Sequence, residues 1–430
     1  MKFAAGLLAL GFTQFVLSSP IAPPKRQTYS QPATTPFSWG DSKLRAVNIG
    51  GWLVLEPWIT PSIFESVDQS LGIVDEYTLT QKLGSSGCDI LKKHWDNWVS
   101  QNDFQKIASA GINVVRIPIG YWAYDNSGSP YCKGAASYID SAIKWARNVN
   151  PPLKVIIDLH GAPGSQNGFD NSGQRMDPTK ITFLQGGMRG YTAQKTIKVI
   201  QMLAVKYAAP AYKDVVEGIE LLNEPIGWQL NNNDLRAFFR EGFNRVRKTG
   251  NTTVVIQDSF LAPSSFNGFL TPTDHDAQNV AMDHHYYQVF DNGQIAMNHD
   301  QHVTQVCNSI GSYTGADKWT FVGEWTGAMT DCTQYLNGYG TGSRYDGTFP
   351  GSPRVGSCDG INDLSKWNQE LKDATTKYLE AQMDAFEKNS QGWAFWNFKT
   401  ERSPEWDFFQ LLDGGIFPNP VNSRRFGPTC

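Results

Sequence analysis

The sequence predicts one closed (β/α)8 barrel, in which parallel strands alternate with helices. Eight short apolar runs bounded by turn residues are candidate strands, at 45–49, 113–117, 153–159, 218–222, 253–257, 280–284, 320–323 and 392–397. Segments with helical spacing of apolar residues lie between several of them, near 197–207, 235–246 and 367–378. Eight strand–helix units are what such a barrel requires. An open doubly wound sheet is less favoured because no Gly-x-Gly-x-x-Gly turn follows a strand, although this excludes only dinucleotide-binding versions.

The composition excludes a disordered chain and a strongly basic nucleic-acid-binding protein. Of the 430 residues, 40% are hydrophobic and 18% are charged, and the formal net charge is −4. No internal repeat and no second hydrophobic block calls for a further domain. Aromatic residues reach 13%, which suits a cleft for sugars, but a large core and a signal segment explain this number equally well.

The N-terminus has the features of a secretory signal. Lys2 precedes an apolar run at 3–17 and two serines, so residues 1–19 are predicted to be a signal peptide. The proline-rich stretch 20–26 ends in a dibasic pair, and cleavage of such a propeptide would leave 27–430 as the barrel domain. No other run is long enough to span a membrane, and no anchor signal ends the chain. We therefore expect a secreted protein, extracellular or in the cell wall, without a membrane anchor.

Six cysteines and one sequon agree with export. None of the cysteines forms a Cys-x-x-Cys pair, so disulfides are favoured over a zinc or redox site. Of the many pairings that six cysteines allow, the preferred ones join Cys307 with Cys430 at the C-terminus, and Cys332 with Cys358 around a glycine-rich segment. The sequon at 251–253 makes Asn251 a candidate glycosylation site.

Polar residues stand at the carboxyl ends of the predicted strands. In a (β/α)8 barrel the active site lies at this end. Any one of them could serve hydrogen bonding at the barrel end, but together they indicate one shared catalytic mouth. These residues are Arg116, Asp158, His160, Asn223, Glu224, His284, His285, Tyr287, Glu324 and Trp396.

Two of these residues, Glu224 and Glu324, follow the predicted fourth and seventh strands and can face each other across the mouth. Two opposed carboxylates are the apparatus of glycoside hydrolysis. A separation of about 5–5.5 Å lets one carboxylate attack the sugar, whereas about 6.5–9.5 Å leaves room for water and inverts the anomeric carbon. The sequence leaves this distance open. No cofactor or metal is expected, because the neighbours His284 and His285 should point to opposite faces of their strand.

Seven motifs resemble those of glycoside hydrolase family 5, and more narrowly those of the fungal secreted exo-β-1,3-glucanases. The resemblance runs from about residue 45 to the C-terminal cysteine. The motifs are RAVNIGGW at 45–52, RIPIGYW at 116–122, DLHGAPGSQNG at 158–168, LLNEP at 221–225, QVF at 288–290, GEW at 323–325 and GWAFW at 392–396.

The resemblance implies a role for each motif residue. Glu224 is expected to be the acid/base and Glu324 the nucleophile of a retaining double displacement, with the pKa of Glu224 above that of Glu324. Asn223 is expected to hold the sugar 2-hydroxyl, and Arg116 and Tyr287 to support the ionised Glu324. The other residues expected to bind substrate are His160 and His285, then Glu56, Asn171 and Trp396 around the terminal glucose, and the aromatic pair Phe169 and Phe290 at the pocket entrance.

The expected function is that of a secreted retaining enzyme that releases glucose from the non-reducing ends of β-1,3-glucan, with transglycosylation open to its covalent intermediate. The expected partner is a β-glucan polysaccharide or oligosaccharide, and a monomer is expected. The alternatives are a β-1,6-glucanase, an endo-β-1,4-glucanase, or a non-catalytic glucan-binding wall protein, against which the two glutamates argue. The glycine-rich segment 337–360 either walls the pocket or forms a disulfide-braced surface loop.

Overall fold

The computed structural model describes residues 27–28 and 37–430. The predicted signal peptide 1–19 and propeptide 20–26 lie outside the described residues. Eight parallel strands close into a barrel in chain order, which confirms the predicted fold and all eight predicted strands. The strands are β2 (Leu44–Asn48), β3 (Val114–Gly120), β4 (Lys154–Gly161), β5 (Val216–Glu220), β6 (Thr253–Gln257), β7 (Val280–His285), β8 (Trp319–Glu324) and β9 (Gly392–Phe395).

Some strands begin or end at other residues than predicted. Two of them continue past their apolar runs, and another ends earlier. β3 and β4 continue to Gly120 and Gly161 because the pairing between them extends through Ile119 and Leu159. β5 ends at Glu220, two residues before the predicted end. The last two residues of the predicted strand, Leu221 and Leu222, are instead fully buried in the loop that follows β5 and leads to the cleft.

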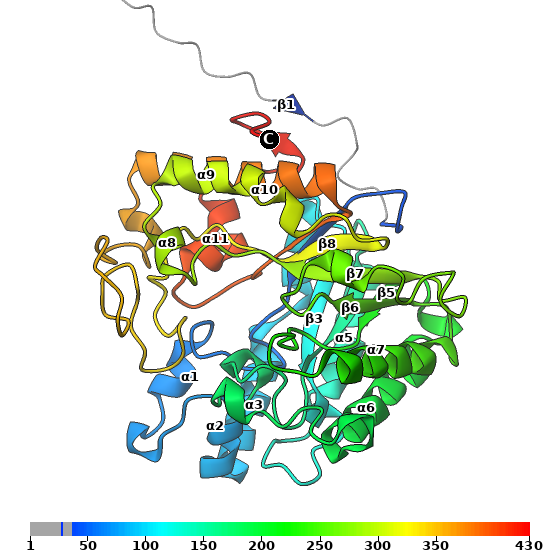
Figure 1. Ribbon diagram of the computed structural model, residues 1–430. Coiled ribbons are helices and arrows are strands. Elements are labelled where there is room, and N and C mark those ends of the chain that lie inside the picture. The colour runs from blue at the N-terminus through cyan, green and yellow to red at the C-terminus, as the bar shows by residue number, and fades with distance from the viewer. Residues whose placement is uncertain (1–26, 29–36) are drawn as a thin grey trace, which may run out of the picture.

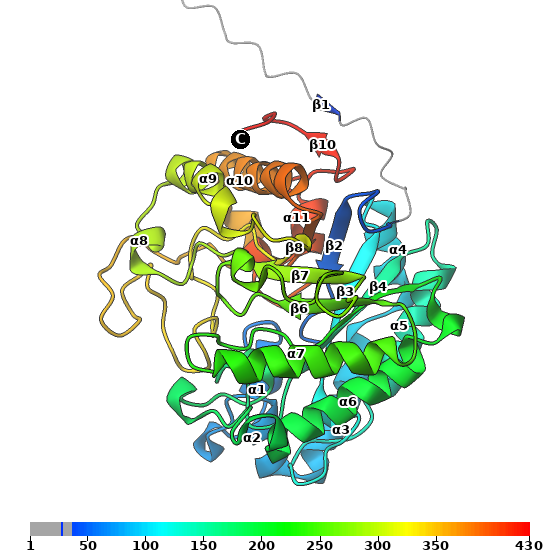
Figure 2. The ribbon, with the colours of Figure 1, turned by 45° about the vertical axis from the view of Figure 1, so that its right-hand side comes forward.

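Helices surround the barrel on its outer side (Figures 1 and 2). The segments with helical spacing correspond to α6, α7 and α10; Trp367 lies just before α10, because the Asn368 side chain caps that helix at the Leu371 amide. The helices are α1 (Pro61–Glu65), α2 (Glu76–Leu83), α3 (Ser85–Trp98), α4 (Gln101–Ser109), α5 (Ala136–Asn148), α6 (Tyr191–Tyr207), α7 (Asn232–Arg247), α8 (Asn292–Ile295), α9 (His299–Asn308), α10 (Gln369–Asn389) and α11 (Phe408–Asp413).

The barrel interior changes from apolar to charged along the strands. Near its amino-terminal end, small and branched apolar side chains fill it, and large residues such as Phe37 and Trp39 close it from below. Side chains two residues apart on a strand point to the same side. Two positions beyond Val114, Ile156 and Ala281, the inward side chains are therefore Arg116, Asp158 and Asp283. This charged layer supports the site above it.

Three disulfides and a short two-stranded sheet tie the periphery together. Cys307 pairs with Cys430 and Cys332 with Cys358, which are the two pairings preferred from the sequence, and Cys88 pairs with Cys132. Next to the C-terminus, β1 (Gln27–Thr28) pairs antiparallel with β10 (Ser423–Arg424). In the part of the chain that the structure describes, no helix combines the length and the apolar character needed to cross a membrane.

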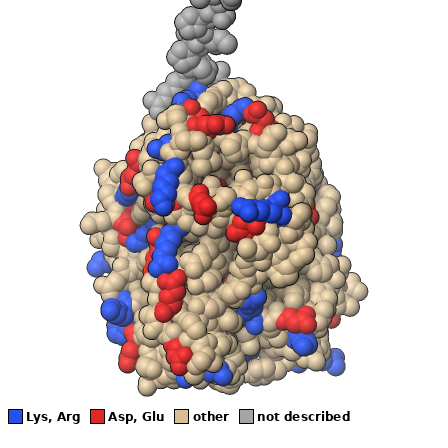
Figure 3. All heavy atoms as spheres, turned by 90° about the vertical axis from the view of Figure 1, so that its left-hand side faces the viewer, with Lys and Arg blue, Asp and Glu red and all other residues tan. Residues whose placement is uncertain are grey.

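The surface carries charges of both signs. On the face shown in Figure 3, basic and acidic side chains alternate and uncharged residues separate them. Asn251 is exposed in the turn between α7 and β6, before the strand begins and therefore away from the carboxyl ends of the strands. Glycosylation of Asn251 stays a prediction.

Candidate active site

The carboxyl ends of the strands meet at one cleft of about 1030 Å³. Four of the predicted site residues are buried behind this lining. Arg116, His160 and His285 contact lining residues, and Asn223 contacts Arg116 and His160. The other eight line the cleft itself: Glu56, Phe169, Asn171, Glu224, Tyr287, Phe290, Glu324 and Trp396. The structure thus brings all twelve together.

The two glutamates are close enough for direct attack on a sugar. His285 Nδ1 lies 2.8 Å from Glu224 Oε1 and 3.3 Å from Glu324 Oε2. One oxygen of each carboxylate and a ring nitrogen of this histidine all lie within 4.8 Å of one another. Two carboxylates with oxygens this close agree with the separation of about 5–5.5 Å in retaining glycosidases better than with the about 6.5–9.5 Å that inverting enzymes need.

Glu324 is held by two donors at the end of β8. The Tyr287 hydroxyl donates to Oε2 at 2.9 Å, and Arg116 Nη1 donates to Oε1 at 3.1 Å. The preceding residue must be glycine, because a Cβ on Gly323 would lie 2.0 Å from Asp283 Oδ1. Both Glu324 oxygens are therefore fixed in direction by the strand and by neutral and cationic partners, as a nucleophile requires.

Arg116 is fully buried and is surrounded by carboxylates. It lies 2.8 Å from Glu220, 3.2 Å from Asp158 and 3.5 Å from Asp283, in addition to Glu324. Burial alone would lower its pKa, but these four carboxylates raise the pKa of Arg116 well above its ordinary value. A permanent positive charge therefore lies directly behind Glu324.

Asn223 and Glu224 follow β5 in the buried LLNEP segment. Asn223 Oδ1 accepts from Arg116 Nη2 at 2.8 Å, so the amide orientation is set before any sugar binds. Glu224 has a positive φ of 45°, which is unusual for a residue other than glycine and turns its side chain into the cleft. Asn171 Nδ2 donates to Glu224 Oε2 at 2.7 Å. Asn171, expected beside the terminal glucose, thus also contacts Glu224.

The pKa directions of the two glutamates are the reverse of those expected. Burial raises the pKa of Glu324 to about 8, although His285 and Arg116 oppose this. Burial acts in the same sense on Glu224, but hydrogen bonds and charge from His285, with the bond from Asn171, lower its pKa overall. The reason is that His285 contacts Glu224 more closely, and its own pKa is raised well above the usual value by Glu324 and Asp283 despite its burial. The lowered pKa therefore favours the charged form of Glu224.

The same three residues, Glu224, His285 and Glu324, could each offer a ligand atom to a metal ion. Arg116 already supplies a positive charge 3.1 Å from Glu324, and a cation placed between the carboxylates would be repelled by it. The adjacent His284 faces away from the cluster and contacts Asp258 at 2.5 Å. The two neighbouring histidines therefore do not form a joint metal site.

Buried acids line another part of the cleft. Glu56 accepts from Trp58 Nε1 at 2.9 Å, and burial with the nearby charge of Asp170 raises the pKa of Glu56 well above its ordinary value. The sequence analysis missed Asp170. Its buried Oδ2 has no hydrogen-bond partner within the described part of the chain, and burial raises its pKa to about 7. An acceptor without a partner at a cleft wall is suited to a ligand hydroxyl. In the sequence, only the position of Asp170 next to Phe169 could have indicated that it belongs to the site.

Trp396 lies against the backbone of the turn that follows β2. A Cβ on Gly50 would come within 2.8 Å of the indole, so only glycine leaves room for this ring. His160 stacks on Trp396 at 5.5 Å with nearly parallel rings, and His160 Nδ1 lies 2.6 Å from Asp158 Oδ2. His160 and the backbone at Gly50 thus hold the Trp396 indole in place.

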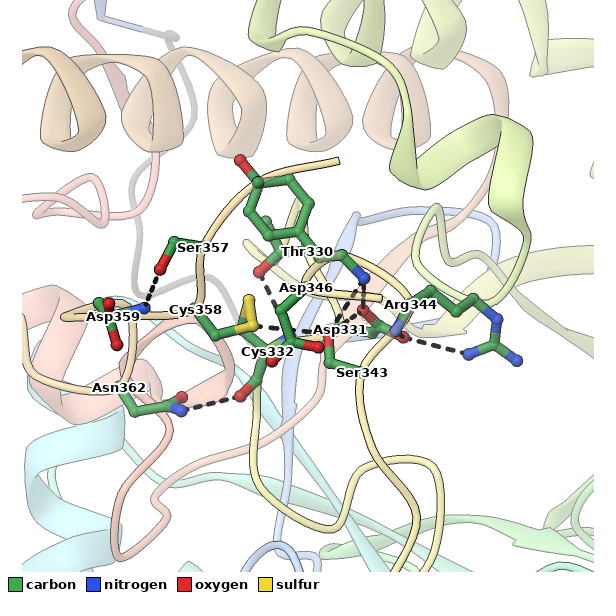
Figure 4. The surroundings of a disulfide bond; sticks show 12 residues. Thr330, Asp331, Cys332, Ser343, Arg344, Asp346, Ser357, Cys358, Asp359 and Asn362 are labelled. Atoms are coloured by element: carbon green, nitrogen blue, oxygen red, sulfur yellow. Dashed lines mark hydrogen bonds and ion pairs between the residues drawn. A yellow bond between two sulfur atoms is a disulfide. The ribbon is translucent and has the colours of Figure 1, made fainter. Parts of the chain in front are cut away.

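The segment after β8 is both a wall of the cleft and a disulfide-braced loop. Arg344 and Phe349 line the cleft, and the guanidinium lies 3.9 Å above the phenyl ring. Figure 4 shows Ser343 and Arg344 converging on Asp331, next to the Cys332–Cys358 disulfide. Both alternatives considered for 337–360 therefore apply together.

Comparisons with known proteins agree with this geometry. The model for cellulase (glycosyl hydrolase family 5) matches residues 80–343. Glucan 1,3-beta-glucosidase 2 of Wickerhamomyces anomalus is 47% identical over 407 residues, 92% of each chain. The glucan 1,3-beta-glucosidase of Blumeria graminis is 46% identical over 400 residues, 92% of this chain and 91% of the relative.

A solved structure shares the fold. The rutinosidase of Aspergillus niger superposes with a TM-score of 0.69 at 20% identity, over 89% of this chain and 100% of that one. The family match and the relatives confirm the resemblance inferred from the motifs. This chain belongs to glycosyl hydrolase family 5.

Proposed function

We propose that this protein is a secreted, retaining exo-β-1,3-glucosidase that releases glucose from the non-reducing ends of β-1,3-glucan. The observation that carries the proposal is the close approach of Glu224 and Glu324, within 4.8 Å through one oxygen each. The substrate is taken from the relatives, which bear the name glucan 1,3-beta-glucosidase. Three disulfides and the predicted signal peptide support export.

In the first step, a carboxylate oxygen of Glu324 attacks the anomeric carbon of the terminal glucose. The bond from that carbon to the glycosidic oxygen breaks, and Glu224 gives its proton to the leaving oxygen. In the second step, Glu224 takes a proton from water, the water oxygen attacks the same carbon, and the ester to Glu324 breaks. β-Glucose is released, or a glycoside if a sugar hydroxyl replaces the water.

The first step needs the proton on Glu224, whereas the contacts from His285 and Asn171 favour the charged form of this carboxyl group. His285 Nδ1 contacts both carboxylates, at 2.8 and 3.3 Å, and offers a direct route for moving the proton between them. A glucosyl ring in the cleft excludes water from Glu224 and thereby raises its pKa, which loads the acid when substrate is present.

Removal of single terminal glucose units requires polar groups that read the hydroxyls of the last sugar. Glu56 and Asn171, with Asp170 Oδ2, which has no hydrogen-bond partner among the described residues, supply acceptors and a donor at the cleft wall. Phe169 and Phe290 are 36% and 46% exposed and offer apolar faces at the entrance.

The test is a time course of products from laminarin, a β-1,3-glucan, with proton NMR to identify the first anomer. We expect glucose alone, initially as the β anomer, and no hydrolysis by Glu324→Gln. A ladder of oligosaccharides would contradict the exo mode, and initial α-glucose would contradict retention. Higher kcat/KM on a β-1,6-glucan or a β-1,4-glucan would favour the alternative specificities. Glucan binding without hydrolysis would indicate a wall protein.

A further inference from the structure

Two adjacent acidic residues at the start of α2, Asp75 and Glu76, are fully buried, and the mechanism does not use them. They belong to the connection from β2 to β3 and do not line the cleft. A buried carboxylate costs free energy unless hydrogen bonds compensate for the lost water. The groups that donate to these two acids therefore show which parts of the chain they hold.

Glu76 holds the segment that carries Glu56. Its Oε2 accepts from the Leu55 amide at 2.9 Å, and its Oε1 accepts from Trp122 Nε1 at 2.8 Å. Leu55 directly precedes Glu56, which lines the cleft. Because both oxygens accept from N–H groups, a charged carboxylate is the form that satisfies both donors. The position of the Glu56 backbone thus depends on Glu76.

Asp75 holds the opposite segment, which follows β4. Its Oδ1 caps α2 by accepting from the Thr78 amide at 2.7 Å, and its Oδ2 accepts from the Arg175 amide at 2.6 Å. Arg175 lies in the same segment as Asp170 and Asn171, which line the cleft. The first turn of α2 therefore contacts two segments that are far apart in the sequence and that both supply polar groups to the cleft.

We propose that Asp75 and Glu76 are positioning residues for the site of the terminal glucose. They join the two segments whose polar groups read its hydroxyls, Glu56 on one and Asp170 and Asn171 on the other. This inference rests on the proposed function. Hydrogen bonds to a sugar weaken when donor and acceptor move apart by a fraction of an ångström, so the spacing of the two segments determines how well the sugar is held.

The first test replaces Glu76 by glutamine, which has nearly the same volume but only one acceptor oxygen. Either the Leu55 amide or the Trp122 indole then faces an NH2 group. We expect kcat/KM on laminarin to fall about tenfold, mainly through KM, because a displaced Glu56 binds the terminal glucose less well. An unchanged kcat/KM would overturn the inference.

The loss should depend on the presence of Glu56. In Glu56→Ala the segment has no carboxylate whose position matters, so adding Glu76→Gln should lower kcat/KM by less than about twofold more. Two losses that multiply would show that Glu76 does not act through Glu56, and would overturn its positioning role.

Thr80→Val is the matched control on the same helix. Thr80 is 2% exposed, and its hydroxyl donates to the Glu76 and Tyr77 carbonyls within α2. This variant should unfold at lower urea concentration, but its kcat/KM should stay within about twofold of the wild-type value. A tenfold loss in Thr80→Val would assign the effect to the stability of the helix and contradict positioning.

Asp75→Asn tests the other segment and decides the question if Glu76→Gln does not fold. Asparagine keeps the cap on the Thr78 amide but turns an NH2 group toward the Arg175 amide. We expect kcat/KM to fall in this variant as well, and the loss to be absent when Asn171→Ala is already present. No loss, or a loss that persists in Asn171→Ala, would refute the role of Asp75.

Binding to Glu324→Gln separates this inference from the proposed function. If the wild-type enzyme releases no glucose from laminarin, the proposed function fails. Calorimetric titration of Glu324→Gln with laminarihexaose then still tests the positioning. A weaker affinity on adding Glu76→Gln, with no further weakening once Glu56→Ala is present, would support it. An equal affinity, or no binding of laminarihexaose at all, would refute it.

Discussion

Arg116 is the side chain on which the charge balance of the active site depends. A buried guanidinium is costly unless it is paired and hydrogen-bonded, and here four carboxylates and two asparagine oxygens surround it. Only one of these carboxylates, Glu324, reaches the cleft. The other three compensate the charge of Arg116 from below, and Arg116 itself opposes the burial that raises the pKa of Glu324.

The first prediction concerns the Tyr287 hydroxyl, which donates a hydrogen bond to Glu324. Tyr287→Phe is expected to lower kcat/KM on laminarin by about tenfold to a hundredfold, since a hydrogen bond to a charged group is worth about 1.5–3 kcal/mol. Loss of a donor that favours the charged form raises the pKa of Glu324. The acidic limb of the pH profile of kcat/KM should therefore move to higher pH.

The neighbouring tyrosine provides the control for this change. Tyr286 lies on the other side of the backbone, and its hydroxyl contacts the Ser309 hydroxyl at 2.6 Å, away from the cleft. Tyr286→Phe should leave the pH profile in place. An unshifted profile for Tyr287→Phe would show that its hydroxyl does not support the nucleophile.

The two glutamates of the cleft could be predicted from the sequence because each stands just beyond a predicted strand, where a charge has no packing role. Glu220 and Asp283 could not, because they lie inside the predicted strands 218–222 and 280–284 and their purpose depends on which side chains share the barrel interior. Alternation along the strand could have indicated them, two positions beyond inward apolar residues. The pKa order of the glutamates was wrong because it depends on the position of His285, which only three dimensions supply.

Among the structural elements, the loop after β8 has the most direct effect on the cleft. Its fold depends on Asp331, which is fully buried and accepts from Ser343 Oγ at 2.6 Å and from the Arg344 and Tyr345 amides at 2.7 and 3.0 Å. Burial opposes ionisation, but these hydrogen bonds lower the pKa of Asp331 overall. The carboxylate thus replaces the regular hydrogen bonding that a long loop lacks.

Asp331→Ala is expected to loosen this loop without unfolding the barrel. Several donors lose their acceptor, so Arg344 and Phe349 are no longer fixed at the cleft, and KM on laminarin should rise about threefold to tenfold. Limited proteolysis should cut between 337 and 360 in the variant only. Asp346→Ala is the control, because the exposed Asp346 side chain bonds only within its own turn. Unchanged KM and proteolysis would contradict this role.

The pH dependence of the loop follows from the lowered pKa of Asp331. The stability that this carboxylate supplies is fully present above the ordinary aspartate value of about 3.9 and is lost as the pH falls through the lower folded value. Proteolytic sensitivity of the wild-type loop should therefore appear only at strongly acidic pH.

The strands could be predicted because both faces of a barrel strand are buried, which gives apolar runs with sharp ends. The loop after β8 could not be resolved in the same way. Its glycines fit an exposed loop and a cleft wall equally, and the choice depends on contacts from Asp331 to residues more than ten positions away.

Across the whole molecule, the disulfides constrain regions of very different size. Cys307–Cys430 joins α9 to the C-terminus across a sequence separation of 123, whereas Cys332–Cys358 spans only 26 within the loop after β8. A cross-link reduces the entropy of the unfolded chain by an amount that grows with the logarithm of the loop it closes. The long connection should therefore contribute more to global stability, and the short one more to the shape of the cleft.

Replacement of each pair by alanine separates these two contributions. Loss of Cys307–Cys430 is expected to lower the free energy of unfolding by about 4–5 kcal/mol, against about 3–4 kcal/mol for Cys332–Cys358, as measured by urea denaturation. Neither Cys307 nor Cys430 lines the cleft, so kcat/KM on laminarin should stay at the wild-type value in the first variant. In the second variant KM should rise, because the loop that carries Arg344 and Phe349 loses its brace. Equal losses of stability and of activity in the two variants would contradict this assignment of one disulfide to global stability and the other to the shape of the cleft.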